Sequence, residues 1–333
     1  MRGVAELRRD PLSGSWVLLA PERADRPGAS IAPAAVNDDP AACPFCPGHE
    51  RETPPELYVI RDPAASDPRT WKLRVVPNKF PALLAESAFA LQATELLTSA
   101  AATGFHEVVI ETPEHAAPPE LDPETIEHLL QAWRERIRVH VSDQRLAAAL
   151  PFKNYGPLAG ASLGHPHSQL VFLPFVPEVL QRELENSARH FDTDGSCLYC
   201  KILEQELTDG RRMVEISDAV VTLCPFASRV PYEMHILPRQ HCSHLEALDD
   251  ATLKALALAL HRALARLQRL FPRQPFNLVV HSGPLRQAPL PSFHLHLELL
   301  PKMSHQGGFE WGSGHQINIV APEAAAARLR AAL

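Results

Sequence analysis

The sequence predicts an α+β fold in which two tandem units share a mainly antiparallel, extended sheet with helices packed on one face. Three observations support this prediction. One series of motifs occurs twice in the same order, each half contains a long amphipathic helix, and the strand-like segments do not alternate with helices as in βαβ units. We place the units at residues 1–190 and 191–333.

The repeated series begins with a Cys-x-x-Cys pair in each half. A strand-like segment, a histidine, a helix, a Gly-Pro-Leu segment and a His-x-His motif follow. The matched features are Cys43/Cys46 and Cys197/Cys200, Glu107 and Glu233, His115 and His241, residues 156–158 and 283–285, and residues 165–167 and 294–296. Because the whole series recurs in order, we interpret the halves as copies of one α+β unit.

Local patterns predict the individual elements. A helix is expected over residues 123–141, where apolar residues recur at helical spacing after the capping pair Asp122 and Pro123. A leucine stripe predicts a second helix over residues 250–270. Strands are expected at residues 171–173, 220–223 and 278–281, and the proline-rich residues 21–40 and 113–119 are expected to form ordered loops.

The paired cysteines indicate two metal sites. A structural zinc ion takes four thiolate or imidazole ligands in a closed tetrahedron. The repeat nominates Cys43, Cys46, His115 and His165 for one site, and Cys197, Cys200, His241 and His294 for the other. The alternatives are cysteines and histidines that only pack in the core, and redox-active Cys-x-x-Cys pairs. Cys224 and Cys242 have no counterpart in the repeat and are expected to be inert.

A catalytic strand is predicted at the first His-x-His motif. On a strand, His165, His167 and Gln169 share one face, with neighbours about 7 Å apart. The small residues within the segment 160–164 allow backbone N–H groups to approach a phosphate. An imidazole can attack phosphorus, and a glutamine can donate to phosphoryl oxygens without delivering a proton, which suits a phosphate leaving group. The alternative is a strand with incidental polar residues.

These motifs resemble the galactose-1-phosphate uridylyltransferase family of the histidine-triad superfamily. The similar segments are residues 9–12, 16–18 and 23–27 near the N-terminus, the Cys-Pro-Phe-Cys of 43–46, the Val-Pro-Asn-Lys-Phe-Pro-Ala-Leu of 76–83, and the Gly-His-Pro-His-Ser-Gln of 164–169. The resemblance extends over nearly the whole chain and implies two histidine-triad-like units on one extended sheet, usually in a homodimer.

The resemblance also implies roles for individual residues. It makes His167 the nucleophile that becomes uridylylated, and Gln169 the residue that steadies the phosphoryl group. Asn154 and Ser162 match phosphate-contacting positions, whereas Arg23, Arg26 and Asn78 match positions around the nucleotide. The implied reaction moves UMP from UDP-glucose to galactose 1-phosphate and releases glucose 1-phosphate.

The chain departs from the best-known members at two places. Glu183, His281, His294 and His296 match a Glu/His metal site of those members. We prefer the set with Cys197 and Cys200, because thiolates favour zinc; iron is the alternative metal at this second site. The glycine-rich residues 307–314 replace a sugar-reading segment and are similar to an ADP-glucose phosphorylase branch.

Three functions follow as hypotheses. The first is a hexose-1-phosphate uridylyltransferase that prefers UDP-sugars and accepts both glucose and galactose phosphates. The second is a nucleoside-diphosphate-sugar phosphorylase of the ADP-glucose phosphorylase type, and the third is a non-catalytic, zinc-stabilised nucleotide-binding protein. The net charge of −7 argues against a nucleic-acid partner. Without a long apolar run or a secretion signal, we expect no membrane association and a cytoplasmic location.

Overall fold

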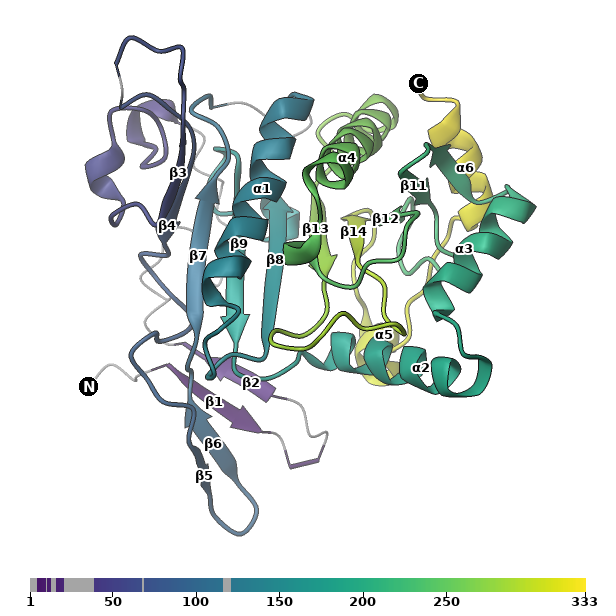
Figure 1. Ribbon diagram of the computed structural model, residues 1–333, viewed down its shortest axis with the longest axis horizontal. Helices are drawn as coiled ribbons and strands as arrows, with labels where there is room; N and C mark the ends of the chain where they lie inside the picture. The colour runs from purple at the N-terminus through teal and green to yellow at the C-terminus, as the bar shows by residue number, and fades with distance from the viewer. Residues whose placement is uncertain (1–4, 10, 13–15, 21–38, 68, 116–120) are drawn as a thin grey trace.

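A ten-stranded antiparallel sheet forms the centre of the molecule in the computed structural model, which describes residues 5–9, 11–12, 16–20, 39–67, 69–115 and 121–333 (Figure 1). Its strands are β3 (Tyr58–Arg61), β4 (Trp71–Pro77), β7 (Phe105–Ile110), β8 (Ala148–Tyr155), β9 (His167–Leu173), β10 (Met213–Ile216), β11 (Val220–Leu223), β12 (Met234–Pro238), β13 (Phe276–His281) and β14 (His296–Pro301). The order across the sheet is β10-β11-β12-β14-β13-β8-β9-β7-β4-β3. The predicted α+β class with an extended antiparallel sheet is confirmed.

The sheet consists of two five-stranded halves with the same internal order. The first half reads β3-β4-β7-β9-β8 and the second reads β10-β11-β12-β14-β13, and β8 pairs with β13 at the junction. At that junction Phe152 pairs with Val279. Phe152 lies four residues before Gly156, and Val279 lies four residues before the corresponding Gly283. Equivalent residues therefore face each other, and an approximate two-fold axis passes through this pair.

The strand register corrects one match in the sequence repeat. Val108 pairs with Gln169, which follows His167 by two residues. In the second half His235 pairs with Glu298, which follows His296 by two residues. Val108 therefore corresponds to His235.

It follows that His106, and not Glu107, corresponds to Glu233. The segment that leads from the strand to His115 is one residue longer than the segment that leads to His241. Glu107 therefore has the same spacing to His115 as Glu233 has to His241, although the two glutamates do not correspond. A shift of one residue places a side chain on the opposite face of the sheet.

Two long helices cover one face of the sheet. They are α1 (Pro123–His140) and α4 (Asp250–Leu270), which pack side by side (Figure 1). Each is capped by an aspartate that accepts a hydrogen bond at 2.7 Å: Asp122 from the Thr125 N–H and Asp249 from the Thr252 N–H. The predicted helix over 250–270 is confirmed, and the first helix ends at His140, one residue earlier than expected.

The other helices are α2 (Glu178–Asp194), α3 (Leu198–Asp209), α5 (Gly308–Ser313) and α6 (Pro322–Arg330), and α3 departs from the prediction that all helices lie on one face. Ala325, Ala326 and Leu329 of α6 belong to the core under α4. Leu203 of α3 packs with Val221 and Leu237, whereas the neighbouring Val220 and Ile236 belong to the core under α4. Because successive residues of a strand point to opposite faces, α3 covers the face opposite α4.

A second, four-stranded sheet was not predicted. It contains β1 (Glu6–Arg9), β2 (Trp16–Leu19), β5 (Leu91–Ala93) and β6 (Thr98–Ala101) in the order β2-β1-β6-β5. Leu7 and Ala100 of this sheet, together with Leu83 from the segment before β5, form a separate small core that reaches the end of β9 at Val171 and Leu173. Among the described residues, no helix has both the length and the apolar composition needed to cross a membrane.

Candidate active site

A cavity of about 300 Å³ opens on the face of the first half opposite α1. His167 and Gln169 line it from β9, while Leu170 of the same strand is buried in the core on the helical side. The other lining residues are Ala42, Pro44, Phe45, Glu52, Thr53, Pro54, Val76, Pro77, Asn78, Lys79, Phe80, Val108, Ser162 and Leu163. Two segments named in the sequence analysis, 43–46 and 76–83, thus contribute walls of one cavity.

The tautomer of His167 follows from one hydrogen bond. Its Nδ1 lies 2.8 Å from the carbonyl oxygen of His165, which can only accept, so Nδ1 carries the proton. Nε2 is then the nitrogen with the lone pair. The imidazole is 7% exposed, and its centroid lies 5.4 Å from that of the Phe45 ring, which lines the same cavity.

A buried ion pair holds the backbone behind His167. Lys153 Nζ donates to Glu111 Oε2 at 2.5 Å and to the His167 carbonyl oxygen at 3.2 Å. Burial lowers the pKa of Lys153, against the opposing charge of Glu111. Sequence reasoning missed this pair, although a lysine directly after the apolar residues 148–152 is a signal. The corresponding positions of the second half are Val280 and Pro238, so the fold itself does not require the charges.

The other residues proposed from the sequence fall in three groups. Asn78 and Ser162 line the cavity. Asn154 is not among the lining residues, and its Oδ1 accepts a hydrogen bond from Asn277 Nδ2 at 2.7 Å. Arg23 and Arg26 lie outside the described residues.

The structure brings together both predicted Cys/His sets. The four candidate ligand atoms of Cys43, Cys46, His115 and His165 lie within 4.8 Å of one another, as do those of Cys197, Cys200, His241 and His294. Each histidine presents Nδ1 to a thiol: the distances to Cys46 Sγ are 3.3 and 3.5 Å, and both distances to Cys200 Sγ are 3.5 Å.

The opposite ring nitrogens are held by backbone carbonyls. Nε2 of His165 lies 2.8 Å from the Thr112 oxygen, and Nε2 of His294 lies 3.0 Å from the Pro238 oxygen. Burial raises the pKa of the Cys46 thiol to about 11, with Cys43 adding to the effect, and lowers the pKa of His165 to about 4. Two cysteine sulfurs and two imidazoles converge in each set, and outer carbonyls fix His165, His241 and His294, an arrangement that fits zinc.

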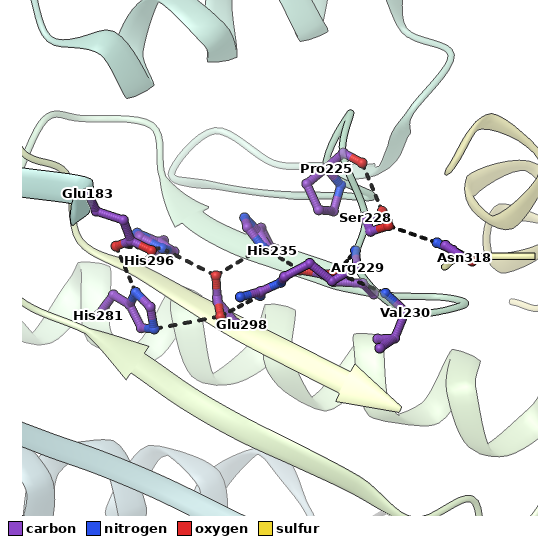
Figure 2. A network of polar contacts seen from close by, with 11 residues as sticks. Glu183, Pro225, Ser228, Arg229, Val230, His235, His281, His296, Glu298 and Asn318 are labelled. Carbon is purple, nitrogen blue, oxygen red and sulfur yellow. Dashed lines mark hydrogen bonds and ion pairs between the residues drawn. The ribbon is translucent and has the colours of Figure 1, made fainter. Parts of the chain in front are cut away.

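A further cluster occupies the second half at the position that His167 and Gln169 take in the first half. Glu183, His281, His296 and Glu298 place their ligand atoms within 4.8 Å of one another (Figure 2). The sequence match had grouped His294 with Glu183, His281 and His296. The structure corrects this, because His294 belongs to the Cys197/Cys200 set and Glu298 takes its place.

Glu298 was missed, although a signal was present. It follows His296 by two residues, as Gln169 follows His167. Arg229 Nη2 donates to Glu298 Oε2 at 2.6 Å (Figure 2). The same nitrogen donates to Glu233 Oε1 at 2.7 Å. Burial opposes ionisation of Glu298, but a hydrogen bond from His296 and the charges of His281, His235 and Arg229 hold its pKa far below the usual range.

Known proteins resemble this chain in sequence over nearly its whole length. Residues 2–177 match the galactose-1-phosphate uridyl transferase N-terminal domain, and residues 183–332 match the C-terminal domain. An ADP-glucose phosphorylase from Arabidopsis thaliana is 36% identical over 98% of this chain and 92% of its own length. A galactose-1-phosphate uridylyltransferase from Thermotoga maritima is 29% identical over 98% of both chains.

A solved structure extends the likeness to three dimensions. An ADP-glucose phosphorylase from Arabidopsis thaliana with bound ADP-glucose superposes with a TM-score of 0.77 at 33% identity, over 98% of each chain. The family domains together span almost the entire sequence. The chain therefore belongs to the galactose-1-phosphate uridylyltransferase family, whose members are enzymes of the nucleotidyltransferase type.

Proposed function

We propose that this protein transfers a nucleoside monophosphate from a nucleoside diphosphate sugar to a second phosphate, through a covalent intermediate on His167. One observation carries the proposal: the His167 ring lines the cavity, and its Nδ1 proton is held by the His165 carbonyl, so that Nε2 has the lone pair. Gln169 lines the same cavity from the same face of β9.

The reaction divides into two displacements. Nε2 of His167 attacks the α-phosphorus, a P–N bond forms, and the bond from that phosphorus to the bridging oxygen breaks, which releases the sugar 1-phosphate. An oxygen of the incoming phosphate then attacks the same phosphorus, and the P–N bond breaks with its electron pair returned to Nε2. No proton needs to reach either leaving group, so an amide at position 169 is sufficient.

The remaining residues take roles around the phosphates. Gln169, Asn154 and Ser162 would contact phosphoryl oxygens, and Asn78 would contact the nucleotide together with Arg23 and Arg26. Zinc in the Cys43, Cys46, His115 and His165 set would stabilise the loop and the strand end beside His167. Zinc, or iron as the alternative metal, would be held by Cys197, Cys200, His241 and His294. A homodimer in the cytoplasm is part of the same proposal.

Intact-mass analysis tests the covalent intermediate. After mixing with UDP-glucose or ADP-glucose, the native protein should gain the mass of one UMP or AMP. The His167→Asn variant should gain none, whereas Gln169→Ala should still gain it slowly. An adduct of equal size on His167→Asn would place the nucleophile elsewhere. No adduct on the native protein with either donor would favour the non-catalytic nucleotide-binding alternative.

The identity of the accepting phosphate gives two candidate functions. The sequence prediction is hexose-1-phosphate uridylyltransferase, which takes UDP-glucose and galactose 1-phosphate and releases glucose 1-phosphate. The second candidate is ADP-glucose phosphorylase, in which inorganic phosphate accepts AMP. The 36% identity to the Arabidopsis phosphorylase, against 29% to the Thermotoga uridylyltransferase, favours the second candidate.

A turnover comparison separates the two candidates. The rate with UDP-glucose plus galactose 1-phosphate is measured against the rate with ADP-glucose plus inorganic phosphate, at equal concentrations. A ratio of about 10 or more, equivalent to ~1.4 kcal/mol of transition-state discrimination, assigns the function to the faster pair. UDP-glucose plus inorganic phosphate is the matched control that tells base preference from acceptor preference.

A further inference from the structure

We propose that His106 is a positioning residue, which fixes the orientation of the Gln169 amide so that its N–H groups are directed at the phosphoryl group. The inference rests on the proposed function, since Gln169 matters only if a phosphoryl group is transferred beside it. His106 lies on β7, adjacent to β9, and is 7% exposed, while Gln169 is 6% exposed.

The first step is the tautomer of His106. The backbone N–H of Ala82 donates to His106 Nδ1 at 3.1 Å. A backbone N–H can only donate, so Nδ1 has no proton, and a neutral imidazole then carries its proton on Nε2. Nε2 lies 2.8 Å from Gln169 Oε1.

The second step is the orientation of two amides. Asn78 Nδ2 also lies 3.0 Å from His106 Nε2, but the Phe80 N–H donates to Asn78 Oδ1 at 2.9 Å and fixes that amide. Two nitrogens that both carry protons cannot share a hydrogen bond, so the proton of Nε2 goes to an oxygen of Gln169. With Oε1 directed at His106, the NH₂ group of Gln169 is directed away from His106.

The consequence concerns the transition state. An amide that rotates by half a turn would place its oxygen, rather than its N–H groups, against the phosphoryl oxygens, and the two negative groups would repel each other. His106 removes this alternative before substrate binds. Donors that are oriented in advance stabilise developing charge without reorganisation during the reaction.

The second half of the chain supplies an internal comparison. The positions that correspond to His106 and Gln169 are Glu233 and Glu298, and Arg229 bridges the two carboxylates. The same strand pair therefore forms without a His–Gln contact. The contact between His106 and Gln169 is a property of the half that contains His167, and the fold alone does not demand it.

A double-mutant cycle tests the proposal. The rate of adduct formation on His167 is measured in single turnovers for the native protein, His106→Phe, Gln169→Ala and the double variant. His106→Phe should slow the reaction about 10- to 100-fold with little change in the donor concentration that gives half the maximum rate. The double variant should be no slower than Gln169→Ala, because His106 acts through Gln169. Rates that multiply in the double variant would overturn the proposal.

Two further variants separate positioning from folding. His106→Gln, whose amide has one acceptor and two donor hydrogens, should recover most of the rate lost in His106→Phe. His128→Phe, the same substitution on α1 away from the cavity, should react at the native rate. If His106→Phe does not fold, His106→Gln carries the test, and a rate as low as that of Gln169→Ala would overturn the proposal.

Nitrogen-15 NMR of labelled histidine gives a readout that does not depend on activity. The resonances that disappear in His106→Gln identify His106 and should show a protonated Nε2. A protonated Nδ1 would overturn the positioning proposal while leaving the proposed function intact. A native protein that forms no adduct would overturn both.

Discussion

Single hydrogen bonds decide which imidazole nitrogen each histidine of the first half can use. His165 and His167 are two residues apart, yet they use opposite nitrogens. His165 donates from Nε2 to the Thr112 carbonyl and presents Nδ1 to Cys46, whereas His167 donates from Nδ1 to the His165 carbonyl and retains the lone pair on Nε2. One backbone segment therefore presents Nδ1 of His165 to the proposed metal and Nε2 of His167 to the phosphorus of the proposed substrate.

A buried triad on the other face of β7 gives a prediction for acid stability. Glu107 accepts from Arg136 at 2.7 and 2.8 Å and from His140 at 3.0 Å, and all three side chains are buried. Burial raises the pKa of Glu107, but the hydrogen bonds from Arg136 and His140 outweigh it and hold the pKa below its ordinary value of 4.5. The stabilisation is thus complete above that value and is lost as the pH falls through the lower pKa of the folded state.

Glu107→Gln should lower the free energy of unfolding by roughly 3–5 kcal/mol at neutral pH, because Arg136 loses its buried charge partner. The variant should also lose less stability than the native protein between pH 5 and pH 3. Urea unfolding at both pH values measures the two effects. Glu135→Gln, which removes a more exposed partner of Arg138, is the control and should change stability by less than about 1 kcal/mol. Parallel pH curves for the native protein and Glu107→Gln would contradict the assignment.

At the level of elements, each Cys/His set is assembled from segments that are far apart in the chain. The first joins the loop at Cys43 and Cys46, the turn at His115 and the residue His165 just before β9. A metal there ties three segments together, so its binding energy contributes to folding.

Cys43→Ser should therefore lower both metal content and stability. Elemental analysis of the native protein should find about two zinc ions per chain, one for each four-donor set, and about one in the variant. Cys224→Ser is the matched control, because Cys224 is buried but lies outside the metal-like clusters of the described residues. Unchanged metal content in Cys43→Ser would contradict the first site, and a third ion in the native protein would assign the Glu183, His281, His296 and Glu298 cluster to a metal.

The elements differ in how well the sequence predicts them. The helix α4 could be bounded to the residue, since its leucine stripe and the Asp249 cap are local signals. The strands β1, β2, β5 and β6 are only three or four residues long and carry little periodicity, so the small sheet could not be predicted. The ligand sets followed from the repeat. Lys153 and Glu111 come together only through the fold, which spacing along the chain does not reveal, whereas the two-residue spacing of His296 and Glu298 was a usable signal.

At the scale of the whole molecule, a nearly symmetric framework carries different side chains in its two halves. The first half places His167 and Gln169 on β9, and the second places His296 and Glu298 on the corresponding strand β14. Around the second pair, carboxylates, histidines and Arg229 form a dense charged network (Figure 2). The proposed chemistry therefore belongs to the first half, and the second half contributes β13, which pairs with β8 of the first half.

The pairing of Phe152 with Val279 has a consequence for the halves when they are separated. An isolated fragment 1–177 would expose the hydrogen-bonding edge of β8, which in the intact chain is covered by its own structural counterpart, β13. An uncovered edge is a template for another strand, and a second β8 approaching in the antiparallel sense is a near-copy of the native neighbour. The fragment should therefore self-associate, with Phe152 opposite Phe152 at the symmetric point.

Sedimentation velocity of fragment 1–177, alone and after addition of fragment 178–333, measures this self-association. The second fragment should displace the self-associated form and give a one-to-one complex. A fragment that stays monomeric and does not bind the second fragment would show that this edge is not self-complementary. If it does self-associate, the covalent link between the halves is what prevents the edge of β8 from pairing with another molecule.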